Sequence, residues 1–287
     1  MPRIAPSACV DPAAELADDV EVGPGCYVGP KVRIGAETRL LPNVTLLGRT
    51  DIGARNIFYP GAVIGAAPQD LKYQGTDTRL VIGDDNIFRE SVTVHTGTEI
   101  GGGITKIGDR NQFQIGSHVA HDVSIGNHCL LSNQVQVAGH VVIEDAVNIS
   151  ALTGIQQFVT VGRYAFIAGL ARVTTDVPPY LIYGGFDGAV IGHNEVGMRR
   201  WKFSEDQIAR IRELYKLLYS KKAGRSGATI SDRLAMAESN GALTEHEKYL
   251  MAFLKRTLHD GVFGRHLERA RRDKQLPPPD FYKSTGA

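Results

Sequence analysis

The hydrophobic pattern of this chain repeats every six residues over most of its first 173 positions. An apolar residue returns at each sixth position from Ile4 to Ile64, from Ile82 to Ile100 and, after a slip of one residue, from Ile107 to Val173. A period of six fits neither an α-helix nor an alternating strand, but it is typical of a parallel β-helix in which each hexad forms one short strand and one turn. The pattern therefore predicts a mainly β fold over residues 1–193, with each inward residue stacked on its equivalent three hexads later.

Two interruptions of the repeat predict loops that leave the wall of the β-helix, at about residues 66–81 and 101–106. The first interruption has Asp70 and Thr76 at inward positions, and the second follows from Gly101-Gly102-Gly103. Loops that project from a rigid repeat are common places for substrate contacts. We therefore expect residues of these loops near a functional site.

The architecture changes after Val173, where the repeat ends in Asp176-Val177-Pro178-Pro179-Tyr180. Residues 194–287 are predicted to form a basic α-helical domain with a C-terminal tail. Capping boxes at residues 204–207 and 244–247 each precede apolar residues at helical spacing. The predicted helices begin at Ser204, cover about residues 230–238, and run from Thr244 to Leu258.

The charge of the chain is divided unevenly between these two parts. Residues 1–193 hold 13 basic and 19 acidic side chains (−6), and residues 194–287 hold 19 and 12 (+7), which together make the net +1. We expect no nucleic-acid partner, because no aromatic-interleaved or zinc-finger pattern accompanies the basic residues, and an acidic protein partner is favoured instead. The sequence also predicts a cytoplasmic protein, because the chain contains neither a run of about 18 apolar residues nor a recognisable signal sequence. The tail at residues 264–287 suggests no function.

The stretch Ser117-His118-Val119-Ala120-His121-Asp122 places two histidines and a carboxylate inside the aliphatic repeat. Counting three hexads per coil puts His121 over Gly139 and Gln157, and Asp122 over His140 and Phe158. His118 lies at the end of the preceding hexad, close to the same corner. The numbering therefore predicts a cluster of three histidines, one carboxylate and one glycine.

These residue types are the parts that acyl transfer to an alcohol requires. A neutral imidazole can take the proton of a hydroxyl, a carboxylate can fix the tautomer of the imidazole, and a glycine N–H can stabilise a developing oxyanion. No serine or cysteine lies in a recognisable nucleophile motif, which favours direct attack by the acceptor hydroxyl over a covalent acyl-enzyme. A zinc site is the competing hypothesis, for which the sequence offers His95, His118, His121, His128 and His140.

Eight further segments, taken in their order and spacing, resemble the UDP-N-acetylglucosamine acyltransferases that begin lipid A synthesis. The segments are QDLKY (69–73), RESVTVHTGT (89–98), GGGITKIG (101–108), HVAHD (118–122), AGH (138–140), QF (157–158), DVPPY (176–180) and residues 194–200. The resemblance covers residues 1 to about 260. It implies a left-handed β-helix, a homotrimer with active sites between subunits, and catalysis without a cofactor or a metal.

On this resemblance the protein transfers a 3-hydroxyacyl chain from acyl carrier protein to the 3-position of UDP-N-acetylglucosamine. The implied catalytic residues are His121 as general base, Asp122 orienting it, and the N–H of Gly139 holding the oxyanion. The positions that match substrate contacts are Asp70, Lys72, His118, His140, Gln156, Gln157, Gly169, Asn194 and Arg200. Within this set Asp70 matches a glucosamine contact, Arg200 a phosphate contact, and Gly169 the position that limits acyl length.

Three positions depart from the pattern of this family. Gln156 and Asp187 stand where the family has histidines, and Val196 stands where it has a glutamate. A glutamine forms hydrogen bonds but cannot take up or release a proton at neutral pH. The departures leave open the choice between a 3-hydroxyl and a 3-amino sugar nucleotide as acceptor. The acyl chain length is also left open by the sequence. The alternative activities are an acetyl-CoA-dependent sugar-nucleotide acetyltransferase and a zinc hydratase like the gamma-class carbonic anhydrases.

Overall fold

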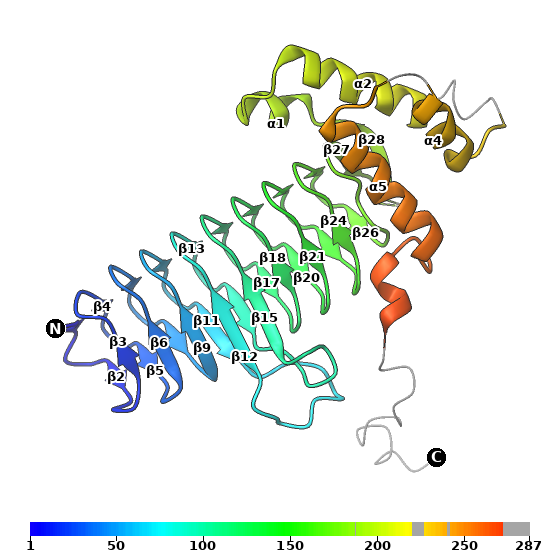
Figure 1. Cartoon of the computed structure of the whole chain (residues 1–287). Helices are drawn as coiled ribbons and strands as arrows, with labels where there is room; N and C mark the ends of the chain where they lie inside the picture. Colours follow the sequence, from blue (N-terminus) through cyan, green and yellow to red (C-terminus); the bar gives the residue numbers. More distant parts are fainter. Residues whose placement is uncertain (187, 220–226, 240–241, 272–287) are drawn as a thin grey trace, which may run out of the picture.

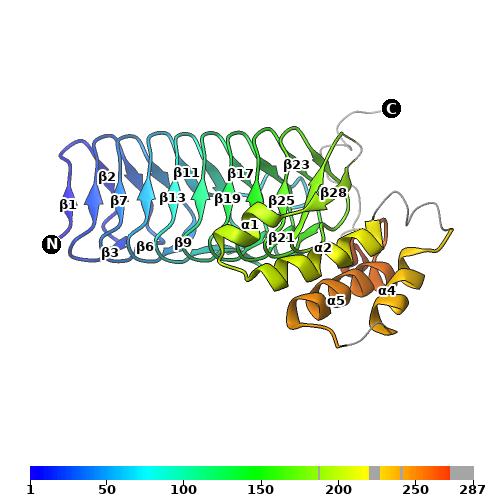
Figure 2. The same cartoon turned by 90° about the horizontal axis from the view of Figure 1, so that it is seen from above.

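The computed structural model describes residues 1–287 except 187, 220–226, 240–241 and 272–287. Short strands wind around one axis as a three-sided parallel β-helix, and helices pack at its C-terminal end (Figures 1 and 2). Successive strands belong in turn to three sheets, which we name A, B and C, so each coil has an A–B, a B–C and a C–A corner. The three-sided coil predicted from the hexads is thus present.

The sheets have the following strands. Sheet A contains β1 (Arg3–Ile4), β4 (Glu21–Val22), β7 (Arg39–Leu40), β10 (Ile57–Phe58), β13 (Ile87–Phe88), β16 (Gln112–Phe113), β19 (Leu130–Leu131), β22 (Asn148–Ile149), β25 (Phe166–Ile167), β27 (Leu181–Gly184) and β28 (Ala189–His193). Sheet B contains β2 (Cys9–Val10), β5 (Tyr27–Val28), β8 (Thr45–Leu46), β11 (Val63–Ala66), β14 (Thr93–His95), β17 (His118–Val119), β20 (Gln136–Val137), β23 (Gly154–Ile155) and β26 (Arg172–Val173). Sheet C contains β3 (Glu15–Leu16), β6 (Val32–Ile34), β9 (Arg49–Ile52), β12 (Arg79–Ile82), β15 (Ile104–Ile107), β18 (Ser124–Ile125), β21 (Val142–Ile143) and β24 (Thr160–Val161).

The core is a column of inward residues rather than a central cluster. Val119 pairs in register with Val137, and Val137 pairs with Ile155, at the predicted spacing of three hexads. All three side chains are at most 3 % exposed. Each buried aliphatic side chain stabilises the fold by about 1.5–3 kcal/mol relative to exposure. The column therefore fixes which residues of each coil point outward at the corners.

The corner turns place outward side chains in vertical rows. Asp122, His140 and Phe158 all lie in the left-handed backbone region, with φ of 59°, 61° and 65°. This conformation is unfavourable for non-glycine residues and persists here because the paired strands on both sides impose it. The three side chains consequently follow one another up the B–C corner.

Both projecting loops emerge at the B–C corner. Residues 67–78 join β11 to β12, and residues 96–103 join β14 to β15, so Ile52 pairs with Ile82 and Ile82 with Ile107. Figure 1 shows the two loops side by side near β12 and β15. The first loop lies within the predicted range of about 66–81, whereas the second begins and ends earlier than the predicted range of about 101–106. The aliphatic period shows which residues point inward, but it does not show where the chain leaves the β-helix.

The C-terminal region contains α1 (Glu195–Arg200), α2 (Glu205–Tyr219), α4 (Ile230–Ser239), α5 (Glu245–Asp260) and the 3-10 helix η1 (His266–Ala270). The predicted capping box of Thr244 and Glu247 begins α5, and α2 buries the predicted stripe of Ile208, Ile211, Leu214 and Leu218. The antiparallel hairpin of β27 and β28 was not predicted, because its strands lack the hexad pattern. Among the described residues, we find no helix with the length and apolar character needed to cross a membrane.

Candidate active site

The predicted histidine cluster forms at the B–C corner. The Nδ1 of His121 lies 2.8 Å from Oδ2 of Asp122, and the His121 ring meets the His140 ring edge-on at a centroid distance of 5.1 Å. His140 in turn stacks on Phe158, with centroids 4.5 Å apart and planes 3° apart. His121 is 5 % exposed although it lies at an outer corner. The count of three hexads per coil therefore predicts the neighbours within this cluster.

Asp122 is held as a hydrogen-bond acceptor by the loop of residues 96–103. Its Oδ1 accepts from the backbone N–H of Thr98 at 2.8 Å, and its Oδ2 accepts from the Thr98 hydroxyl at 2.6 Å. The backbone N–H of Asp122 donates to Thr105 Oγ1 at 2.8 Å. Because the Asp122 carboxylate acts as an acceptor, Nδ1 of His121 carries the proton, which leaves Nε2 as the basic nitrogen.

The backbone of Gly139 lies close beside the His121 ring. A Cβ atom at position 139 would lie 2.4 Å from Cε1 and 2.7 Å from Nε2 of His121. Within the described part of the chain, the N–H of Gly139 donates to no protein acceptor. A glycine is therefore required here for the imidazole to keep its place, and its N–H is available beside that imidazole.

The change Gly139→Ala is expected to lower kcat by roughly 100-fold, because the new methyl group displaces the His121 ring by about 1 Å. Steady-state kinetics at saturating substrates measure this loss. Gly192→Ala is the control, since its Cβ would meet Ile182 at an ordinary 3.4 Å. Wild-type kcat in Gly139→Ala would exclude the close contact from any role in turnover.

The loop of residues 67–78 brings Asp70 and Lys72 to the same corner. Asp70 Oδ1 pairs with Lys72 Nζ at 2.7 Å, and Asp70 Oδ2 lies 3.8 Å from Nε2 of His121. Burial alone would raise the pKa of Asp70, but the hydrogen bonds and charge of Lys72 outweigh it and lower the pKa. Asp70 is thus an ionised carboxylate facing the basic nitrogen of His121.

Two more histidines lie beside the cluster in uncharged form. His118 Nδ1 lies 2.7 Å from Thr93 Oγ1, and its ring meets His95 at a centroid distance of 4.8 Å. Burial, with smaller contributions from neighbouring histidines, lowers the pKa of His118 and lowers that of His95 to about 4. The acyl-transfer site predicted from the sequence did not include Thr98, and His95 was considered only as a zinc ligand. Counting three hexads per coil misses them, because the loop of residues 96–103 lengthens their coil.

A groove of about 470 Å³ runs along sheet B from this corner. Its lining includes His118, Ala138, Gly154, Gln156 and Arg172. Gln156 is exposed and Gln157 is partly exposed at the turn that follows β23. The sequence-predicted residues at positions 118, 121, 122, 139, 140, 156 and 157 therefore share one side of the molecule.

Three predicted substrate contacts lie at other corners of the same chain. Asn194 is buried at the C–A corner, where its amide donates to Tyr164 O at 2.8 Å and its Oδ1 caps α1. Arg200 is exposed at the end of α1 and forms no ion pair within the described residues. Gly169 is exposed at the A–B corner, between β25 and β26. One chain does not bring these residues to His121.

Of the other departures from the family pattern, Val196 lies on α1, away from the cluster. Val196 is 61 % exposed on α1, and Asp187 lies outside the described residues.

The basic side chains of α1 and α2 are largely paired, since Arg199 contacts Glu195 and Glu205, and Arg210 contacts Glu247. These ion pairs reduce the cationic surface that the charge count suggested.

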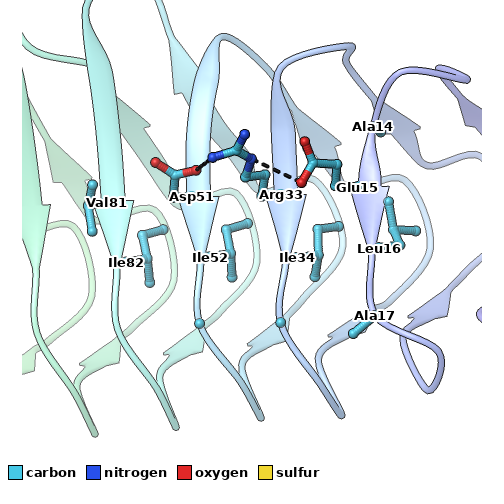
Figure 3. Close-up of a pocket in the computed structure, with 12 residues that line it drawn as sticks. Ala14, Glu15, Leu16, Ala17, Arg33, Ile34, Asp51, Ile52, Val81 and Ile82 are labelled. Carbon is cyan, nitrogen blue, oxygen red and sulfur yellow. Dashed lines mark ion pairs between the residues drawn. The ribbon is translucent and has the colours of Figure 1, made fainter.

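A broader depression of about 810 Å³ lies on sheet C near the N-terminus (Figure 3). Its floor is a row of stacked aliphatic residues that includes Ile34, Ile52 and Ile82. Arg33 lies above them between Glu15, at 3.2 Å, and Asp51, at 3.9 Å. The described lining has no histidine, cysteine or hydroxyl group, and its two carboxylates, Glu15 and Asp51, are both ion-paired with Arg33.

The donor atoms of His121, Asp122 and His140 lie within 4.8 Å of one another, as in a metal site. However, the Asp122 carboxylate already accepts from Thr98 and His121. The two histidines of the pair considered for zinc also have different partners, since His118 contacts Thr93 on sheet B and His121 contacts Asp122. The donor set fits a hydrogen-bonded general base better than a zinc centre.

Comparisons with known proteins show the family to which the chain belongs. A family model described as UDP N-acetylglucosamine O-acyltransferase, domain 2, matches residues 176–262. An acyl-[acyl-carrier-protein]–UDP-N-acetylglucosamine O-acyltransferase from Myxococcus xanthus is 46 % identical over 237 residues, which are 83 % of this chain and 92 % of that protein. A protein of the same name from Anaeromyxobacter is 42 % identical over 212 residues, covering 74 % and 80 %.

The structure of a UDP-N-acetylglucosamine acyltransferase from Bacteroides fragilis superposes with a TM-score of 0.83 at 38 % identity, covering 88 % of this chain and 96 % of that chain. The fold and site thus define an acyltransferase built on a left-handed parallel β-helix, and the handedness implied by the resemblance is confirmed. The chain belongs to the family of acyl-[acyl-carrier-protein]–UDP-N-acetylglucosamine O-acyltransferases. This membership decides against the zinc hydratase as the activity of the chain.

Proposed function

We propose that this protein transfers a 3-hydroxyacyl chain from acyl carrier protein to the 3-position of UDP-N-acetylglucosamine, the first step of lipid A synthesis. The relatives carry the name of this reaction. The observation that carries the mechanism is the contact of the His121 imidazole with both the Asp122 carboxylate and Gly139. That arrangement places a base and an N–H donor next to each other.

In the proposed reaction Nε2 of His121 takes the proton of the sugar hydroxyl, and the hydroxyl oxygen bonds to the thioester carbon. The N–H of Gly139 stabilises the oxyanion of the tetrahedral intermediate. The C–S bond then breaks, the carbonyl re-forms, and the departing thiolate takes the proton back from His121. Asp122 keeps the imidazole in the tautomer that this cycle needs.

Asp70 and Lys72 are proposed to hold the acceptor sugar. The Asp70 carboxylate lies 3.8 Å from Nε2 of His121, so a sugar bound beside them can donate a hydroxyl group to each. His118, His140, Gln156 and Gln157 are proposed to contact the substrates from the B–C corner. Neutral His118 suits this role, because an uncharged imidazole both donates and accepts.

Asn194, Arg200 and Gly169 are proposed to belong to sites completed by a neighbouring subunit of a homotrimer. They lie at the C–A and A–B corners, whereas His121 lies at the B–C corner. An exposed Arg200 suits a nucleotide phosphate, which a guanidinium binds in a bidentate manner. In such a trimer, Arg200 of one subunit faces His121 of the next.

The test is an assay of the purified protein with carrier-linked 3-hydroxyacyl chains of several lengths and a panel of UDP sugars, read by the mass of the product. We expect an acyl ester on UDP-N-acetylglucosamine. The panel includes the 3-amino analogue of this sugar, for which the product is an amide. Transfer from acetyl-CoA but from no acyl carrier protein would contradict the proposal.

A further inference from the structure

The C-terminal turn is anchored firmly on the last coil of the β-helix. The buried Asp176 Oδ2 accepts from the backbone N–H of His266 at 2.9 Å and from its Nδ1 at 2.7 Å. Arg265 Nη1 donates to Thr174 O at 2.7 Å, and the N–H of Asp176 donates to Gly264 O at 2.7 Å. These bonds join positions far apart in the sequence, so they fix where η1 lies (Figure 1). The segment also follows the end of the family match at residue 262.

This anchored turn forms one wall of a pocket at the catalytic corner. Leu267 and Ala270 of η1 line a cavity of about 340 Å³ together with Asp122, His140 and Phe158. Residues 100–102, from the loop that also binds Asp122, line the same cavity. The C-terminal segment is therefore part of the surroundings of the site.

One side chain of this segment extends the row of aromatic rings. The Arg271 guanidinium lies over the Phe158 ring, 5.4 Å from its centroid, and is also ion-paired with Glu268 at 3.3 Å. The other neighbour of Phe158 is the stacked His140 ring, which meets His121 edge-on. The contacts thus form a continuous column in the order Arg271, Phe158, His140, His121.

We propose that Arg271 and Phe158 are positioning residues, which hold the His140 ring and through it the His121 ring in the geometry required for acyl transfer. The flat shape of the Phe158 ring matters for this role, in addition to the area of its contact with His140. A flat ring in parallel contact fixes the tilt of the stacked imidazole, and a cation over the aromatic ring favours the ring in that orientation. A flexible aliphatic side chain of similar volume fills the space without fixing the tilt. The inference rests on the proposed role of His121 as base.

The test compares Phe158→Leu with Phe158→Tyr by steady-state kinetics on the full chain. Because a displaced base impairs the chemical step, we expect Phe158→Leu to lower kcat by about 10-fold or more, with KM for both substrates within about 3-fold of wild type. Phe158→Tyr keeps the ring and is expected to retain wild-type kcat within about 3-fold. Phe263→Leu is the matched control, since Phe263 is 75 % exposed outside the column.

Two results would contradict the proposed positioning role of Phe158 and Arg271. One is a wild-type kcat in Phe158→Leu, and the other is an equal loss in Phe158→Leu and Phe158→Tyr, which would indicate packing volume alone. Thermal unfolding monitored by circular dichroism checks that each variant is folded. If Phe158→Leu does not fold, Arg271→Ala decides, with an expected loss of kcat of about 3-fold for removal of a cation–π contact. An unchanged kcat in Arg271→Ala would then reject the proposal.

The outcome is separable from that of the proposed function. If the wild-type protein transfers no acyl group from acyl carrier protein, the proposed function fails. If the wild-type protein transfers the chain, His121→Ala is inactive and the Phe158 variants are all fully active, only the positioning role fails.

Discussion

Replacement of His121 by alanine is expected to lower kcat by about 100- to 10,000-fold, the usual contribution of a general base. The imidazole is held between Asp122 and Gly139, so its removal takes away the base without changing the core of the β-helix. The measurement is the initial rate of product formation at saturating donor and acceptor. The binding of UDP-N-acetylglucosamine, measured by calorimetry, is expected to change much less than kcat.

Two further variants sharpen this experiment. His121→Asn retains a donor toward Asp122 but has no basic nitrogen, so it is expected to be as inactive as His121→Ala. His259→Ala is the control, because His259 is exposed on α5, outside the histidine cluster. Substantial turnover in His121→Asn would show that hydrogen bonding, and not proton transfer, is what His121 provides.

Mixed trimers of His121→Ala and Arg200→Ala subunits are expected to regain about one third of wild-type activity, although each variant alone is inactive. If His121 comes from one subunit and Arg200 from the next, every mixed trimer has one junction at which both side chains are intact. The structure motivates this expectation, since Arg200 and His121 lie at different corners of one chain. Co-expression with two affinity tags and tandem purification isolates the mixed trimers for the assay.

The matched control is the mixture of His121→Ala with Asp122→Asn. These two side chains are hydrogen-bonded within one chain, so no arrangement of subunits restores an intact pair. We expect no recovery from this mixture. Recovery in both mixtures would indicate activity that does not depend on a shared site, such as contaminating wild-type protein. Recovery in neither mixture would indicate that Arg200 and His121 act within the same subunit, which contradicts the shared site.

The part of the site that the sequence predicted lies in the uninterrupted repeat. Beyond Ile107 each coil consists of three hexads, so the neighbours of His121 and Asp122 follow from subtraction alone. The corner backbone then directs Asp122, His140 and Phe158 outward in one row. Local periodicity was sufficient here because the inward aliphatic residues leave only one register with a buried core.

The inserted loops and the hairpin did not follow from this periodicity. The loop at 67–78 lies within its predicted range, but the loop at 96–103 begins before its predicted range. This second loop makes its coil longer than three hexads, as the pairing of Ile82 with Ile107 shows. That extra length hid the contact of Thr98 with Asp122 and of His95 with His118. A fixed count fails wherever the chain leaves the wall.

The sequence by itself therefore determined the coil, its inward residues and the stack around His121, since these depend on short-range alternation of apolar and outward positions. Only the tertiary structure decided how Asp122 is held by Thr98, how Asp176 anchors His266, and how Arg271 comes to lie over Phe158. These contacts join residues that are far apart in the chain and belong to different elements. They depend on side-chain packing and hydrogen bonding between those elements, which no local pattern encodes.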